Sequence, residues 1–593
     1  MFISTSVIAS LIQFVITVEL GVQGSSKPTP KLARVDASGR RTGHPQQPTK
    51  QGPQGSYHRA SCDFVDEIVG QRTLYDAHDF QRQSPLWDHS GRNSAGSVPA
   101  PQLELIPLGL SGSADNRVDL VFFSDGYLSS ERAKFIADAT RLADDVSKNQ
   151  TFYTVKPLLN FWAAFSPSKE AERNRSSTVY GLYRQGTQLR GVYYSKPEVA
   201  RAACASLGSR CDYPILLAND PLYGGLGGEF TVITSSYLNG PLVLRHELGH
   251  SIIEVGEEYD GGFAYCGVNA AHESERTSSL PWKQWLTEQP LAKEAAKSSN
   301  GGSLSQPPSA PRVERSIMPF QSYPWTMLKA RSPWIAEFTS SGEYSRYLVK
   351  FSLSGVPEKS NLRVELDGVD LGWAPEPLVG VDRWHYDIFV SEKLAPGPHE
   401  LRFALQDSKL EGISQLCSVE VLEFGDESEF NSTPGHYSLY PTFSLSNETS
   451  YRPTNQDCLM RAVVKPNFCK ACMETLWLQL LKRVHLIEGL NESCNAHGTR
   501  TLALDLVPLA HLRTGDERAV AEISNESYTI TWTKDSKPLE KHTNQTSIHL
   551  NKTDSVGKYT VQVKFATDAV RLTDSSALVD TLEHQISSPC PHA

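Results

Sequence analysis

Two histidines four positions apart are the first residues of this chain whose type and spacing could do chemistry. His246 and His250 lie in the segment PLVLRHELGHSIIEVGEEYD at 241–260. On a helix, residues at this spacing stand about one turn apart on the same face, so both imidazoles can reach one Zn²⁺ ion. Glu247 follows the first histidine, where a general base for a zinc-bound water is expected. The pattern predicts a hydrolytic zinc centre, and a plain histidine pair on a helix is the alternative.

A catalytic zinc ion needs a third protein ligand, and the carboxylates that follow the histidines are the candidates. Glu257 shares the azimuth of the histidine pair, but on a continuous helix it would lie roughly 13 Å from the midpoint of the pair. The chain must therefore leave the helix and return, and we expect Gly256 to permit that turn. Glu257 and Glu258 are then the candidate ligands, and Asp260 is a poorer one.

The chain around this segment alternates strand and helix signals. Short apolar runs bounded by turn residues predict buried strands at 117–123, 213–217 and 230–234. Apolar residues at helical spacing predict a helix at 129–146. The alternation predicts a mixed α/β fold for about 101–265.

The segment HELGHSIIEVGEEY resembles the HExGH…(D/E)EY signature of the IgA peptidase family of zinc metallopeptidases, which belongs to the zincin clan. Four further segments are similar to parts of that family. They are NRVDLVFFSDGY at 116–127, LLNFWAAFS at 158–166, YGGLGGEF at 223–230 and CLMRAVVKPNFCKAC at 458–472. The resemblance covers about 101–265 and 457–490, and it implies a zincin-like α+β catalytic domain that hydrolyses peptide bonds.

The resemblance also implies roles for the residues of the first motif. His246 and His250 would be zinc ligands, and Glu247 would be the general base. The family usually has Asp where this chain has Glu257, followed by a Glu that matches Glu258. We therefore expect Glu257 to be the third ligand, with Glu258 as the alternative.

Two more segments receive roles from the resemblance. Met460 would lie beneath the metal as the residue of a Met-turn, and Met318, in SIMPF, is a weaker candidate for that role. Residues 223–234 would form an edge strand above the metal that pairs with an extended substrate, with Gly227 and Gly228 in contact with it. A glycine turn that feeds a core strand is the alternative for this segment.

The signals divide the chain into six expected parts. They are a signal peptide at 1–24, a disordered leader and N-terminal segment at 25–100, a first part of the catalytic domain at 101–345, a β-sandwich insertion at 346–425, a second part of the catalytic domain at 426–494 and an immunoglobulin-like β-sandwich at 495–593. Because the insertion interrupts the catalytic domain, we expect it to lie near the cleft and to shape the choice of substrate.

Cysteines and glycosylation motifs favour a secreted glycoprotein. The ten cysteines are an even number, which is typical of disulfide pairing in an oxidising compartment, and Cys204 and Cys211 are close enough to form a local loop. Eight N-x-[ST] motifs favour a glycosylated surface. They begin at Asn149, Asn174, Asn431, Asn447, Asn491, Asn525, Asn544 and Asn551.

The pair Cys469 and Cys472 has the CxxC spacing of half a zinc-binding motif. In a secreted chain with Cys458 and Cys266 available as partners, we expect disulfides instead.

Net charge and hydropathy argue against two classes of protein, those that bind nucleic acids and those anchored in a membrane. The 593 residues carry a net charge of -10, whereas a nucleic-acid-binding protein would carry a basic surface. No stretch after the signal peptide is long and apolar enough to anchor the chain in a membrane. The sequence therefore predicts a secreted, Zn²⁺-dependent metalloendopeptidase that acts on protein or peptide substrates. The alternative is a catalytically silent zincin scaffold that serves as a binding or adhesion module.

Overall fold

In the computed structural model, the described residues are 98–148, 151–169, 178–184, 186, 188–261, 267–276, 279–287, 311–444, 448–551, 555–573 and 575–590. The expected signal peptide and nearly all of the expected leader lie outside these residues, as do Asn149, Asn174, Cys266 and Asn447. The described residues all belong to one unit, 61–593. Within them, every helix is too short or too polar to cross a membrane.

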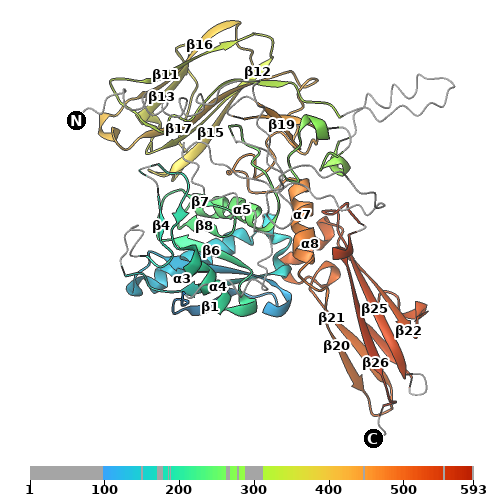
Figure 1. The fold of residues 1–593 in the computed structure, drawn as a ribbon. Coiled ribbons are helices and arrows are strands. Elements are labelled where there is room, and N and C mark those ends of the chain that lie inside the picture. Colours follow the sequence, from blue (N-terminus) through green and yellow to red (C-terminus); the bar gives the residue numbers. More distant parts are fainter. Residues whose placement is uncertain are drawn as a thin grey trace, which may run out of the picture. The chain divides into compact units, whose positions relative to one another are not determined.

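A six-stranded sheet forms the centre of the first part of the chain (Figure 1). In spatial order its strands are β1 (Glu104–Gly109), β3 (Leu159–Phe165), β2 (Val118–Asp125), β6 (Tyr213–Ala218), β8 (Thr231–Thr234) and β7 (Gly225–Leu226). The four inner strands are parallel, whereas β1 and β7 run antiparallel at the two edges. The three predicted strands are confirmed as β2, β6 and β8.

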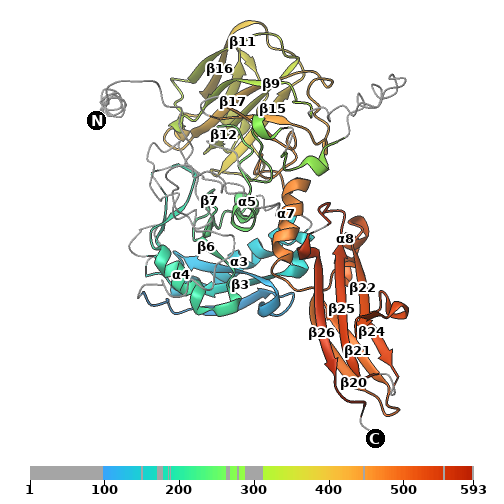
Figure 2. The ribbon, with the colours of Figure 1, turned by 45° about the vertical axis from the view of Figure 1, so that its right-hand side comes forward.

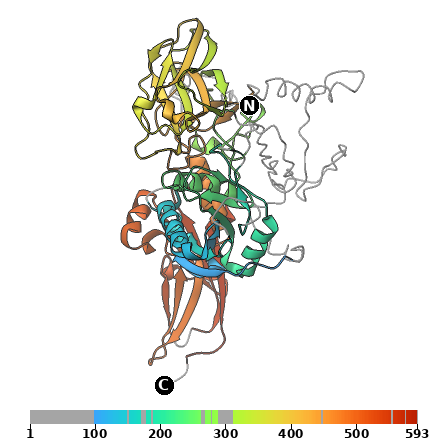
Figure 3. The ribbon, with the colours of Figure 1, turned by 90° about the vertical axis from the view of Figure 1, so that its left-hand side faces the viewer.

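Helices cover both faces of this sheet (Figure 3). They are α3 (Arg132–Val146) and α5 (Asn239–Ile252) on one face and α4 (Pro197–Ser206) on the other. Leu120 and Phe122 of β2 pack in the cluster with α3 and α5, and Val121 and Phe123 pack in the cluster with α4. Because successive side chains of a strand point to opposite faces, β2 is buried on both and reads as a nearly continuous apolar run. The predicted helix is confirmed as α3, and the mixed α/β fold is confirmed with it.

Two packed sheets follow in the sequence (Figure 2). One contains β9 (Ser316–Ser322), β10 (Thr326–Met327), β12 (Arg346–Ser354), β15 (Arg383–Val390) and β17 (Gln415–Phe424). The other contains β11 (Trp334–Ser340), β13 (Leu362–Leu366), β14 (Val369–Asp370) and β16 (Gly397–Leu405). An apolar core that includes Phe351, Phe403 and Val419 lies between them. The strands begin about thirty residues before position 346, so the expected boundary falls inside this β-sandwich.

The chain then returns to the α/β part before it forms a second pair of sheets. The returning segment contains β18 (Tyr440–Phe443), β19 (Thr449–Arg452) and α7 (Lys470–Leu481). The final sheets are formed by β20 (Ile487–Cys494), β21 (Arg500–Leu506) and β24 (Ser547–Leu550), and by β22 (Ser527–Lys534), β23 (Lys537–Pro538), β25 (Gly557–Ala566) and β26 (Val579–Ile586). A disulfide joins Cys494 to Cys590 across this region, and the expected Cys204–Cys211 disulfide is confirmed.

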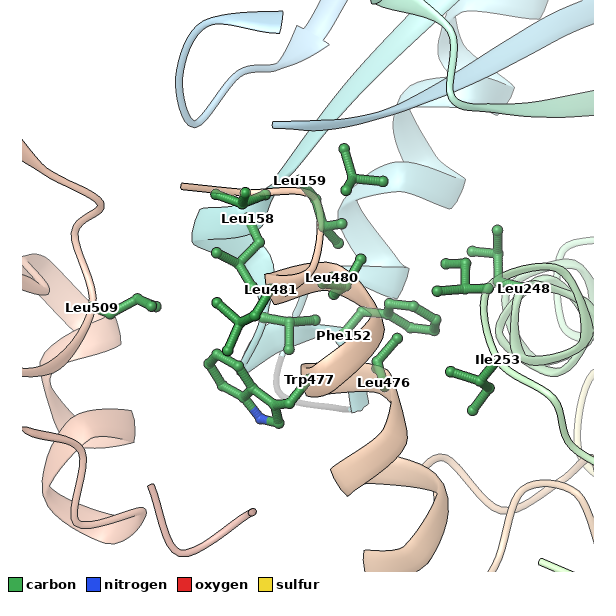
Figure 4. Packing of buried hydrophobic residues seen from close by; sticks show 14 of the residues in the cluster. Phe152, Leu158, Leu159, Leu248, Ile253, Leu476, Trp477, Leu480, Leu481 and Leu509 are labelled. Atoms are coloured by element: carbon green, nitrogen blue, oxygen red, sulfur yellow. The ribbon is translucent and has the colours of Figure 1, made fainter. Parts of the chain in front are cut away.

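Helix α7 joins the returning segment to the core around α5 (Figure 4). Its sequence KACMETLWLQLL is apolar on most of its circumference, which is typical of a buried helix. Leu476 and Leu480 belong to the same buried cluster as Phe152 and as Leu248 of α5. The returning segment therefore contributes to the core that supports the candidate metal-binding helix.

Candidate metal centre

Helix α5 carries three of the predicted site residues. Leu244, Leu248 and Ile252 are fully buried and form its apolar side, which leaves His246 and His250 on another side. The two imidazole rings lie 5.0 Å apart between their centroids, at an interplanar angle of 78°. The helix ends at Ile252, and Ile253 is extended, so the chain leaves the helix before Glu257 as the sequence predicts.

Glu257 returns to the histidine pair. Its Oε1 lies 3.3 Å from His246 Nε2 and 3.0 Å from His250 Nε2, and its Oε2 lies 3.2 Å from His246 Nε2. Ligand atoms that bind one zinc ion at about 2.0–2.1 Å in tetrahedral geometry are about 3.4 Å apart. Two imidazoles and one carboxylate are also a common donor set for catalytic zinc. Both the donor types and the separations between the histidine nitrogens and the Glu257 carboxylate therefore fit a zinc ion held by these three residues.

The turn that brings Glu257 back differs from the expected one. Gly256 is not among the glycines with a positive φ, so it does not provide left-handed backbone. Asn269 holds the segment instead, because its Oδ1 accepts from Gly256 N at 2.8 Å and its Nδ2 donates to Gly256 O at 2.8 Å. The same Nδ2 donates to Glu258 Oε1 at 2.8 Å. Asn269 was not singled out in the sequence, because a lone asparagine downstream of the motif carries no spacing signal.

Burial and mutual charge set the protonation of the pair His246 and Glu257. Burial disfavours the imidazolium, but the charge and hydrogen bond of Glu257 raise the pKa of His246 to about 9. Burial likewise disfavours a charged carboxylate, yet the two histidines hold the pKa of Glu257 well below its ordinary value. A protonated His246 beside an ionised Glu257 is therefore favoured, and a divalent cation bound between the same atoms would replace that proton.

Glu247 is placed beside the two histidines without bridging them. Its carboxylate oxygen and one ring nitrogen from each histidine lie within 4.8 Å of one another. Burial raises the pKa of Glu247, while the histidine charges and the Gly227 N–H act in the opposite direction. A buried carboxylate with a raised pKa, next to a metal site, is suited to general-base chemistry.

The two glycines proposed to bind substrate lie against α5. A Cβ on Gly227 would stand 2.7 Å from His250 Cβ and 2.9 Å from Glu247 Oε2, so only glycine fits there. Gly228 has a φ of 122°, and its carbonyl accepts from Ser251 Oγ at 3.1 Å. Both glycines follow β7, the last strand of the sheet, whose Gly225 is bridged to Gly191, and this places their backbone beside the candidate metal ligands.

Met460 lies beneath α5, whereas Met318 lies elsewhere. The Sδ atom of Met460 would be 3.3 Å from a Cβ on Gly249, and the preceding Leu459 carbonyl is 3.2 Å from His246 Nδ1. This contact directs Nε2 of His246 toward Glu257. Met318 is in β9 and packs with Leu348 and other residues of the β-sandwich, so it is an ordinary core residue.

Replacing Gly249 by alanine is expected to destabilise the protein by about 1–2 kcal/mol. The new Cβ would stand 2.9 Å from Phe468 Cζ, and overpacking of this kind costs about 1–3 kcal/mol, more than the helix propensity that alanine gains. Differential scanning calorimetry measures the loss as a lower Tm. Gly109→Ala is the control, because nothing lies within 4 Å of its Cβ position. Equal Tm values for both variants would show that Phe468 moves aside at no cost.

Glu258, the alternative third ligand, points to a different group of residues. Its carboxylate lies with the thiols of Cys458, Cys469 and Cys472, and the four ligand atoms are all within 4.8 Å of one another. The three cysteines are free, so the expected disulfides among them are wrong for the described residues. The reason is geometric, because the sulfur of Cys472 lies 3.9 Å from that of Cys458 and 3.6 Å from that of Cys469, both well beyond a disulfide bond, and the Glu258 carboxylate lies among the three sulfurs.

The β-sandwich contacts the α/β part through the residue that precedes β15. The Asp382 carboxylate accepts from Tyr223 N at 2.6 Å, from Ser236 Oγ at 2.7 Å and from Asn239 Nδ2 at 2.9 Å. Asn239 is the first residue of α5, so Asp382 ties the β-sandwich to the start of the candidate metal-binding helix.

Tyr223, Arg383 and His385 meet at this contact, and no sequence pattern marked Arg383 or His385, whereas Tyr223 begins the segment expected to form the edge strand. The rings of Tyr223 and His385 are 6.0 Å apart, and the Arg383 guanidinium lies 4.8 Å from the Tyr223 ring. Burial raises the pKa of Tyr223, and the charges of Glu247 and Glu257 act on it as well. Residues of β15 lie more than 120 positions after α5 in the sequence, and no motif marks them.

Residues 106–323 match the family model described as IgA Peptidase M64. Over these residues the chain is similar to the IgA peptidase M64 family. The match confirms the resemblance for the motifs within 106–323, including α5 and Glu257, whereas the similar segment at 458–472 lies outside it. The M64 family indicates a peptidase, which is a hydrolase acting on protein or peptide substrates.

The chain was also compared with curated proteins and with solved structures. No curated protein matches the chain. A β-porphyranase of glycoside hydrolase family 86 from the gut bacterium Bacteroides plebeius is 16% identical over 18% of this chain and 20% of its own, with a TM-score of 0.15. An FMN-binding β-glucuronidase from Facaelibacterium prausnitzii is 10% identical over 46% of this chain and 38% of its own, with a TM-score of 0.12. The chain thus spans less than half of either structure, and at these scores the similarity indicates neither fold nor function.

Proposed function

We propose that this protein is a secreted, zinc-dependent metalloendopeptidase of the M64 family with a zincin-like catalytic domain. The observation that carries the proposal is the convergence of His246, His250 and Glu257 at 3.0–3.3 Å, with Glu247 beside them. A zinc ion at these ligands would supply an activated water and polarise the scissile carbonyl. Glu247 would accept the proton of that water and deliver it to the leaving amine.

The surroundings of the centre support a peptide as substrate. The short strand β7 ends the sheet beside α5, and because its Gly225 is bridged to Gly191, an extended peptide would pair through main-chain hydrogen bonds with the backbone that follows it, at Gly227 and Gly228. Tyr223 and His385 would flank the bound peptide from the side of the β-sandwich. We therefore propose that the β-sandwich contributes to the choice of substrate.

Exposed glycosylation motifs and two disulfides support the proposal that the protein is secreted and glycosylated. Asn491, Asn525, Asn544 and Asn551 are exposed, so each could accept a glycan. The disulfides Cys204–Cys211 and Cys494–Cys590 are typical of proteins that fold in an oxidising compartment.

Removal of metal from the secreted protein is expected to abolish cleavage of casein, and added Zn²⁺ is expected to restore it. Plasma emission spectrometry should find one zinc per chain fewer in His250→Ala than in the unmodified protein, because His250 is a ligand in this proposal. Cleavage that survives full chelation would contradict the zinc mechanism. If the unmodified protein binds this zinc and His250→Ala loses it, but the unmodified protein cleaves no substrate, the binding or adhesion module would be favoured instead.

A further inference from the structure

A second cluster of metal-ligating side chains lies behind the loop that carries Glu257. It consists of Glu258, Cys458, Cys469 and Cys472, and we call it the Cys3Glu cluster. All four residues are at most 2% exposed. Cys458 Sγ lies 3.9 Å from Cys472 Sγ, and Cys469 Sγ lies 3.6 Å from Cys472 Sγ. Among the described residues, the pairs Cys204–Cys211 and Cys494–Cys590 form disulfides, whereas the three cysteines of this cluster are free thiols.

We propose that the Cys3Glu cluster binds a structural zinc ion, separate from the catalytic one. Thiolates that bind zinc at about 2.3 Å in a tetrahedron are about 3.8 Å apart, and the two sulfur separations lie on either side of that value. A carboxylate oxygen supplies the fourth ligand, which closes the site against water, as in structural zinc sites. Soft thiolate donors favour zinc over calcium or magnesium.

The Glu258 carboxylate is the second observation that points to a cation. Its Oε1 accepts from Asn269 Nδ2, whereas its Oε2 is buried and receives no hydrogen bond from a nitrogen or oxygen donor of the described residues. A buried carboxylate oxygen without such a donor is costly unless a cation or proton satisfies it. A zinc ion among the three sulfur atoms would do so.

The start of α7 provides favourable electrostatics for thiolates. Cys469 is the N-cap of α7 and Cys472 lies in its first turn, where the helix N-terminus stabilises negative charge. Buried Arg452 adds positive charge that acts on Glu258, whereas Arg461, which is paired with Asp260 at 2.7 Å, donates to the Glu258 carbonyl at 2.8 Å and holds its backbone. Both features stabilise the anionic ligands that zinc requires.

A zinc ion in the Cys3Glu cluster would fix the geometry of the catalytic centre. Glu258 directly follows Glu257, and its N–H donates to the Met460 carbonyl at 3.0 Å. Cys458 directly precedes Leu459, whose carbonyl contacts His246. The ion would therefore join the loop that carries the third catalytic ligand to the segment that lies beneath α5. This is a positioning role, because none of the four residues contacts the reacting atoms.

The test uses a His246→Ala/His250→Ala protein, so that it does not depend on the proposed peptidase activity. We expect this protein to retain about one zinc per chain, and to lose it when Cys469→Ser and Cys472→Ser are added. Cys417→Ser, which removes a buried free thiol outside the cluster, is the matched control and should retain the zinc. Zinc content that is unaffected by the cysteine substitutions would overturn the proposal.

A second measurement covers the case in which the cysteine variants fail to fold. Cobalt(II) is added to the His246→Ala/His250→Ala protein after its zinc is removed, and the absorption spectrum is recorded. We expect intense thiolate-to-cobalt charge-transfer bands in the near ultraviolet, which histidine and carboxylate ligands do not produce. Absence of these bands, together with a disulfide between two of the three cysteines in mass spectra of the purified protein, would contradict the proposal.

Discussion

Replacing Glu247 by glutamine is expected to lower kcat/KM for peptide cleavage by about 10²–10⁴-fold while the catalytic zinc stays bound. Glutamine keeps the size and shape of the side chain but cannot accept a proton from a water. Because the ligands His246, His250 and Glu257 are unchanged, the metal content should equal that of the unmodified protein. Single-turnover cleavage of a fluorogenic peptide and plasma emission spectrometry measure the two quantities on the same sample.

Glu254→Gln is the matched control for this prediction. Glu254 lies just after α5, is exposed to solvent and is seven residues from Glu247 in the sequence. The control should retain full activity, because its carboxylate is outside the centre. Full activity of Glu247→Gln with zinc bound would mean that another group acts as the base, and Tyr223 and His385 would be the next residues to replace.

Much of the α/β part could be predicted because its local signals agree with its tertiary structure. β2 is buried on both faces, so its apolar run identifies it as an inner strand without further information. The spacing of His246 and His250 likewise needs only one helix. The limits of the β-sandwich were harder to predict, because β9, β10 and β11 are short or only partly buried and their partners are distant in the sequence.

The residues that complete the centre could not be predicted from local patterns. Asn269 acts through two backbone groups of Gly256, and Leu459 acts through a carbonyl, so neither role depends on a recognisable side-chain motif. His385 lies beside Tyr223 because hydrogen bonds from Asn239 of α5 to the Asp382 carboxylate and the Arg383 carbonyl hold the start of β15 against that helix. The cysteines were expected to pair from composition and compartment, but the fold places Glu258 among three of them.

Replacing Glu257 by alanine is expected to weaken binding of the catalytic zinc by more than about 100-fold, and to abolish cleavage at ordinary zinc concentrations. Loss of a residue that only orients a ligand costs about 10–100-fold in affinity, and loss of the ligand itself should cost more. Glu257 is also the carboxylate that approaches both histidines, at 3.0 Å and 3.2 Å. Competition with a fluorescent zinc chelator measures the affinity.

Two further variants decide between Glu257 and Glu258 as the third ligand. Glu257→Asp should recover part of the affinity, since the family pattern usually has aspartate at this position and the chemistry of the donor is unchanged. Glu258→Gln should leave the catalytic zinc in place and reduce the zinc of the Cys3Glu cluster, because its carboxylate faces Cys458, Cys469 and Cys472. If Glu258→Gln removed the catalytic zinc and Glu257→Ala did not, Glu258 would be the ligand, and the loop would have to rotate from the arrangement that Asn269 holds.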